Sequence, residues 1–132
     1  MSNLKDLIKK HEGFAPKVYL CPAKRWTIGY GRNVQDLGIT QLEADQLLEN
    51  DILRVTLEAK ENFMWFNFLT PKRQDAVLCM IFQLGIARFK QFKKTIGLLA
   101  AGDYEAAANE ALNSAWAKQT PERAREVSDM LR

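Results

Sequence analysis

One stretch, residues 11–31, constrains this chain more than any other, because a helical pattern gives way there to a glycine-rich strand pattern. Upstream of it, apolar residues recur at helical spacing, which predicts an amphipathic helix over residues 3–12 that stops at Gly13. Downstream, residues 17–20 and 25–32 have the composition of two strands joined by a tight turn. A helix that leads directly into a hairpin predicts an α+β fold.

The second predicted strand has two unlike faces. Trp26, Ile28 and Tyr30 alternate on one face, which we expect to pack. Thr27 shares the other face with glycines, including Gly31, whose bare backbone would let an extended ligand approach closely. Glycines inside a strand also mark β-bulges, so a purely structural role for them stays open.

Three side chains in this stretch could carry chemistry. Glu12 ends the predicted helix, Cys21 follows after eight intervening residues, and Thr27 follows after five more. A carboxylic acid, a thiol and a hydroxyl this close in sequence suit acid–base or nucleophilic chemistry. We therefore take Glu12, Cys21 and Thr27 as the candidate catalytic set.

Other chemistries find less support in the sequence. His11 and Cys21 could form a nucleophile pair, but His11 falls on the apolar stripe of its helix, where a lone histidine more often packs. The single histidine and the two distant cysteines, Cys21 and Cys79, lack the spacing of a zinc site or of a disulfide framework. The sequence contains no phosphate loop or dinucleotide fingerprint. We expect neither a metal nor a cofactor.

The rest of the chain is predicted to be helical. Thr40 and, three residues on, Glu43 form a capping box that opens a long helix. Thr70–Pro71 and Thr120–Pro121 repeat a cap-plus-proline signal that opens two more helices. Gly85 is expected to end the first of these two.

Composition narrows the class of protein. The chain has 132 residues, 47% of them hydrophobic and 27% charged, which is the size and make-up of one globular domain. Its net charge of +3 is spread without a basic run, so nucleic-acid binding is not supported. No apolar run approaches the roughly 20 residues of a membrane span, and the N-terminus lacks the apolar core of a signal peptide. We expect no stable membrane insertion.

Residues 12–34, EGFAPKVYLCPAKRWTIGYGRNV, resemble the phage-type lysozymes of glycoside hydrolase family 24, the family of the T-even phage lysozyme. That family's catalytic spacing is Glu, eight residues, Asp or Cys, five residues, Thr. Phe82-Gln83-Leu84-Gly85 resembles its cleft motif, and Trp116 with residues 119–124 resembles its C-terminal part. The resemblance covers nearly the whole chain.

The resemblance implies a single lysozyme-like domain over residues 1–132. Its fold would be α+β and mainly helical, with a small N-terminal antiparallel β-sheet and a helical C-terminal lobe around a cleft. A small α/β lobe is expected at about residues 13–60, and a helical lobe from residues 1–12 plus 61–132.

The resemblance also implies a muramidase, an endolysin that hydrolyses the β-1,4 bond between N-acetylmuramic acid and N-acetylglucosamine in peptidoglycan. Glu12 would be the general acid, and Thr27 would position the attacking water, giving inversion at the anomeric carbon. Arg123 would pair with Glu12 and orient it. Cys21 stands where the best-known members have Asp, and three roles stay open for its thiol: base, nucleophile or near-passive neighbour.

Further residues receive supporting roles from the same resemblance. Gly31, Phe82 and Gln83 would line the sugar cleft, and Thr95 is a further candidate for that role. Arg32 and Asp51 would form a structural salt bridge. The protein would be a monomer made in the host cytoplasm, and it would need a separate holin to reach the cell wall.

Two other functions compete with this hypothesis. A lytic transglycosylase uses one glutamate and no water, and the absence of Asp at position 21 could point that way, although Thr27 favours hydrolysis. A peptidoglycan-binding module could retain the fold without catalysis, although Glu12, Thr27 and Arg123 argue against that. The products formed from purified walls would separate these three functions.

Overall fold

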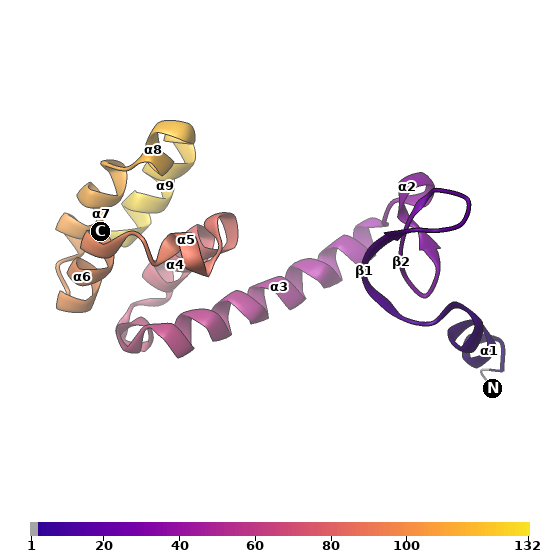
Figure 1. Cartoon of the computed structure of the whole chain (residues 1–132). Coiled ribbons are helices and arrows are strands. Elements are labelled where there is room, and N and C mark those ends of the chain that lie inside the picture. The colour runs from indigo at the N-terminus through magenta and orange to yellow at the C-terminus, as the bar shows by residue number, and fades with distance from the viewer. Residues whose placement is uncertain (1–2) are drawn as a thin grey trace. The chain divides into compact units, whose positions relative to one another are not determined.

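The structure, a computed structural model, describes residues 3–132 and divides into two compact units. Unit 1 ends at Gln46 and unit 2 runs from Leu47 to Arg132. The molecule is mainly helical with one small antiparallel sheet, so the predicted α+β class is confirmed (Figure 1). Residues 61–132 of the predicted helical lobe lie in unit 2, whereas helix 3–12 lies in unit 1. That residues 1–12 join the helical lobe therefore stays a prediction.

Unit 1 holds the sheet. Its elements are α1 (Asn3–Glu12), β1 (Ala15–Leu20), β2 (Trp26–Gly29), β3 (Arg32–Asn33), α2 (Val34–Leu37) and the start of α3 (Gln41–Asn62). The strands pair in the order β1-β2-β3, and Thr27 of β2 lies opposite Tyr19 on one side and Asn33 on the other. The register of β1 against β2 shifts between Ala15 and Tyr19.

The predicted strand over residues 25–32 is wrong in one respect, since it is broken into β2 and β3. Gly29 and Gly31 both take positive φ, +70° and +75°, and so turn the chain back on itself after β2. Thr27 and Gly31 therefore do not share one strand face. The apolar face packs only in part within unit 1: Trp26 and Tyr30 are 46% and 45% exposed, although the Tyr30 ring lies 5.6 Å from that of Phe14.

Unit 2 is wholly helical. After α3 it contains η1 (Met64–Phe68), α4 (Pro71–Leu84), α5 (Ile86–Phe89), α6 (Lys93–Ala101), α7 (Tyr104–Leu112), α8 (Ala115–Gln119) and α9 (Pro121–Leu131). The Thr70 side chain accepts a hydrogen bond from the Arg73 N–H at the start of α4, and Gly85 ends that helix at φ +83°. Both ends of α4 lie where the sequence predicts them.

The hydrophobic core belongs to unit 2. Every hydrophobic residue that the described chain buries lies between Val55 and Leu131, and the largest include Phe66, Phe89 and Met80. Helices α4, α7 and α9 pack around this core. Within the described residues, no helix is both long enough and apolar enough to cross a membrane.

Arg73 ties the start of α4 to the end of α9. Its Nε donates to the Leu131 carbonyl at 2.8 Å, and its Nη2 donates to the Arg132 carbonyl. The guanidinium also lies over the ring of Tyr104, 3.9 Å from the ring centroid. One side chain thus joins three helices of the unit.

Candidate active site

Glu12 lies at the last position of α1, against the turn between β2 and β3. Gly13 takes φ +68° and donates its N–H to the Lys9 carbonyl at 2.9 Å, which closes the helix. A Cβ atom built on Gly31 would lie only 2.6 Å from Oε2 of Glu12. The Glu12 carboxylate therefore rests on the bare backbone of Gly31 while its side chain stays exposed to solvent.

Thr27 is buried in the middle of the sheet, with 3% of its surface exposed. Its Oγ1 donates to the Arg25 carbonyl at 2.9 Å. Because a hydroxyl has one proton and two lone pairs, this bond leaves Oγ1 with acceptor capacity only. Thr27 can accept a hydrogen bond from a water molecule and orient it, but it has no spare proton to donate.

Cys21 lies at the start of the turn that joins β1 to β2, and it is a free thiol. Its N–H donates to the Arg25 carbonyl at 3.0 Å, the same oxygen that accepts the Thr27 hydroxyl. Hydrogen bonding from the Arg25 backbone lowers the pKa of the thiol; partial burial opposes that shift, and the Thr27 hydroxyl supports it. The structure thus brings Cys21 and Thr27 together around one carbonyl.

Gln83 in unit 2 is held by a partner that the sequence did not reveal. Its Oε1 accepts a hydrogen bond of 2.9 Å from Nε1 of Trp116, which is 3% exposed. The bond fixes which way the amide faces and leaves its NH₂ group free to donate. Phe82 precedes Gln83 at the end of α4 and is 48% exposed. Both residues are therefore available to a ligand of unit 2.

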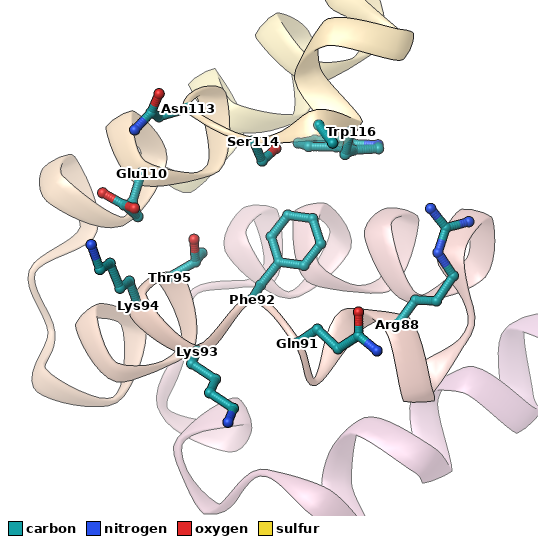
Figure 2. A pocket seen from close by; sticks show the side chains of 11 residues that line it. Arg88, Gln91, Phe92, Lys93, Lys94, Thr95, Glu110, Asn113, Ser114 and Trp116 are labelled. Carbon is teal, nitrogen blue, oxygen red and sulfur yellow. The ribbon is translucent and has the colours of Figure 1, made fainter.

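Thr95 lines a pocket of about 460 Å³ formed by α5 to α8 (Figure 2). Thr95 is 2% exposed, and Phe92 and Trp116 form aromatic walls whose centroids are 6.2 Å apart. Three cations border the same pocket: Arg88, Lys93 and Lys94. The sequence alone does not mark these cations as functional, because solvent-exposed basic residues are common on helices.

Arg123 lies on α9 and lines a second cavity of unit 2, of about 530 Å³, together with Phe82 and Cys79. Burial, reinforced by the nearby Asp75 carboxylate, raises the pKa of the Cys79 thiol. Glu12 belongs to unit 1 and Arg123 to unit 2. Their pairing therefore stays a prediction.

Arg32 belongs to unit 1 and Asp51 to unit 2, so their predicted salt bridge stays a prediction. Nη1 of Arg32 donates to Oε2 of Glu43, whereas Asp51 accepts from Arg54 at 3.4 Å on the same helix. The capping box leaves Oε2 of Glu43 for Arg32, because Oε1 accepts the Thr40 N–H. Within unit 1, the Arg32–Glu43 ion pair thus ties β3 to the start of α3.

Comparison with known proteins shows the family to which the chain belongs. The family model for phage lysozyme matches residues 9–129. An endolysin from Acyrthosiphon pisum secondary endosymbiont phage 1 is 37% identical over 116 residues, covering 85% of this chain and 75% of the relative. Two proteins of Dictyostelium discoideum named probable T4-type lysozymes 2 and 1 are 28% and 27% identical, covering 96% and 99% of this chain and 92% and 94% of the relatives. The chain belongs to the phage lysozyme family.

Proposed function

We propose that this lysozyme hydrolyses the β-1,4 bond between N-acetylmuramic acid and N-acetylglucosamine in bacterial peptidoglycan, with Glu12 as its general acid. Membership of the phage lysozyme family makes the chain a glycoside hydrolase of the cell wall. The observation that carries the residue assignment is the Glu12 carboxylate resting on Gly31, in the unit that also holds the Cys21–Thr27 pair.

In the proposed reaction, Glu12 gives its proton to the glycosidic oxygen as the bond to the anomeric carbon breaks. A water molecule held by Thr27 attacks that carbon from the opposite face, so the configuration inverts. The contact between Thr27 Oγ1 and the Arg25 carbonyl supports this role, because it leaves the hydroxyl able only to accept from the water. The second proton of the water passes to a base, and Cys21 is the nearest candidate.

Cys21 has the base-like or water-positioning role in this proposal. Its lowered pKa supports a larger thiolate fraction than an ordinary cysteine has at the same pH. A thiolate would also attract the single Thr27 proton away from the Arg25 carbonyl, which couples the two side chains. A nucleophilic Cys21 would instead give a glycosyl–thiol adduct and net retention, and a passive Cys21 would leave activity nearly unchanged when replaced.

Substrate contacts are assigned to both units. Gln83 would offer its free NH₂ group to the sugar chain. Phe82, Thr95 and, in unit 1, Gly31 would make further contacts with the sugar chain. Arg123 would orient Glu12. We further propose that the protein acts as a monomer, is made in the host cytoplasm and reaches the wall through a separate holin.

A lytic transglycosylase and a wall-binding module are the alternative functions. The first would form a 1,6-anhydro sugar end, because no water enters the reaction. The second would bind walls and release no product. The Thr27 hydroxyl, set to accept from water, favours hydrolysis over both.

The first test is clearing of purified peptidoglycan by the wild type, Glu12→Gln and Cys21→Ala, with analysis of the product ends and of their anomeric configuration. We expect clearing and inverted reducing ends from the wild type, and a loss of about 10²- to 10⁴-fold in Glu12→Gln. Asp6→Asn, an isosteric change on the same helix, is the matched control and should clear normally. A 1,6-anhydro end, or no product from the walls of several species, would overturn the hydrolase proposal.

A further inference from the structure

We propose that Gly31 is the positioning residue for the general acid, because the missing side chain at this turn leaves the space in which the Glu12 carboxylate sits. The inference rests on the proposed role of Glu12. It gives Gly31 a function different from that of a residue lining the sugar cleft.

The geometry is specific to one side chain. A Cβ atom on Gly31 would lie 2.6 Å from Oε2, 2.8 Å from Cδ and 3.1 Å from Cγ of Glu12. All three contacts are shorter than an ordinary van der Waals separation between such atoms, which is about 3.5–4.0 Å. The carboxylate and the methylene that carries it both occupy the place that a Gly31 side chain would take.

Backbone conformation does not explain this glycine fully, because two neighbours share the conformation without the contact. Gly13 and Gly29 have φ of +68° and +70°, close to the +75° of Gly31, yet a Cβ on either would meet nothing within 4 Å. The left-handed backbone disfavours a side chain at all three positions. Of these three glycines, only Gly31 must also leave space for the catalytic carboxylate.

A methyl group at position 31 would move the acid and leave the turn in place. The atoms it meets belong to the far end of the exposed Glu12 side chain, which can rotate away, whereas the backbone of the turn need not move. Relief of the contact requires a shift of about 1 Å in the carboxylate to restore an ordinary separation. A misplacement of that size in a catalytic group lowers the rate by about 10²-fold.

The experiment compares Gly31→Ala with Gly29→Ala, which imposes the same backbone strain and no contact with Glu12. We expect kcat on soluble peptidoglycan fragments to fall by about 10²-fold in Gly31→Ala, with KM nearly unchanged. Gly29→Ala should lose only a few-fold, and the two variants should show similar decreases in Tm. The ¹³C resonance of the Glu12 carboxyl should shift in Gly31→Ala and stay in place in Gly29→Ala.

A shorter acid provides the rescue. Glu12→Asp withdraws the carboxylate by one methylene, so adding Gly31→Ala to it should lower kcat much less than it does in the wild type. Equal kcat in Gly31→Ala and Gly29→Ala, or a Gly31→Ala variant that alone fails to fold, would overturn the proposal. The Glu12 carboxyl resonance reports the contact with position 31 even if Glu12 has no role in catalysis. Failure of the proposed function would be revealed separately, by full activity of Glu12→Gln.

Discussion

Each of the two units of this lysozyme is stabilised internally by a different kind of interaction. Unit 2 is built around buried hydrophobic side chains from Val55 to Leu131, whereas Thr27 is the one buried residue in the described part of unit 1. Unit 1 relies on turns, on hydrogen bonds such as Thr27 to the Arg25 carbonyl, and on ion pairs such as Arg32–Glu43. The proposed acid and its water-positioning partner thus lie in the unit that, by itself, has no hydrophobic core.

This difference indicates that stability and the orientation of the proposed catalytic side chains come from different units. A buried core gives unit 2 most of the apolar stabilisation, because that stabilisation scales with the apolar area removed from water. Polar contacts at an exposed surface contribute less each, but they set directions and distances. The interactions of unit 1 therefore mainly orient its side chains, whereas those of unit 2 mainly stabilise its fold.

The largest effect is expected when one aromatic ring is removed from each unit in turn. Phe89 is 0% exposed and packs edge-on against Phe63, so Phe89→Ala should lower the free energy of unfolding by about 3–5 kcal/mol. Phe14 is 67% exposed, and Phe14→Ala should change it by less than about 1 kcal/mol. Urea titration of both variants measures the difference. Similar losses in the two variants would contradict the comparison.

A smaller effect is expected where unit 2 uses a polar contact. Trp116→Phe keeps an aromatic ring in the core but removes the N–H that Gln83 accepts. Loss of this bond, together with the space that the smaller ring leaves, should lower the free energy of unfolding by about 1–3 kcal/mol, and the freed amide should also raise KM. Thermal unfolding and steady-state kinetics check both effects. Gln83→Leu should unfold much as Trp116→Phe does if the bond is the cause.

The reactivity of one thiol in each unit, Cys21 and Cys79, gives a comparison that needs no destabilising substitution. The pKa of Cys21 lies below its ordinary value of about 9.0, because backbone N–H groups stabilise the thiolate, and that of Cys79 lies above it, because burial disfavours the charge. Cys21 should therefore react faster with iodoacetamide at neutral pH. Cys79→Ala and Cys21→Ala each leave one thiol, and the pH midpoint of alkylation should lie lower in the first variant. A reversed order would show that the hydrogen bonds at Cys21 are not maintained in solution.

The smallest expected effect concerns the pH dependence of unit 1. The Thr40 N–H and the Arg32 guanidinium lower the pKa of Glu43 below its ordinary value of about 4.5. The carboxylate therefore contributes stability that is complete above that ordinary value and is lost as the pH falls through the lowered pKa. The protection factors of the β3 amides, which are corrected for the intrinsic exchange rate at each pH, should fall over that acidic range in the wild type. Glu43→Gln should remove this part of the pH dependence while the amides of α4 stay unaffected.

The features that sequence predicted well are local. The end of α1 at Glu12 and Gly13, and the start of α3 at Thr40, each depend on residues within one helical turn. The reciprocal bonds between Thr40 and Glu43, of 2.8 and 3.2 Å, are those of the predicted capping box. Such signals need no knowledge of distant chain.

The features that sequence did not predict depend on contacts or backbone angles. Two positive-φ glycines break the expected strand over residues 25–32, and residue alternation carries no information about φ. The bond from Trp116 to Gln83 joins residues 33 positions apart. The ion pair that Arg32 forms with the second oxygen of the capping residue Glu43 was not predicted either. The Glu12–Gly31 contact likewise appears only in three dimensions.

The clamp made by Arg73 has a consequence for the order of folding. Its bond to the Leu131 carbonyl spans 58 positions, whereas Thr27 and Arg25 are 2 apart and Trp26 and Gln35 are 9 apart. Loop closure entropy rises with the length of chain enclosed, so contacts of long span form after those of short span. We expect the hairpin of unit 1 to appear early and to open and close repeatedly. The seam between α4 and α9 closes late, and the side chain that joins α4 and α7 to the end of α9 completes the structure.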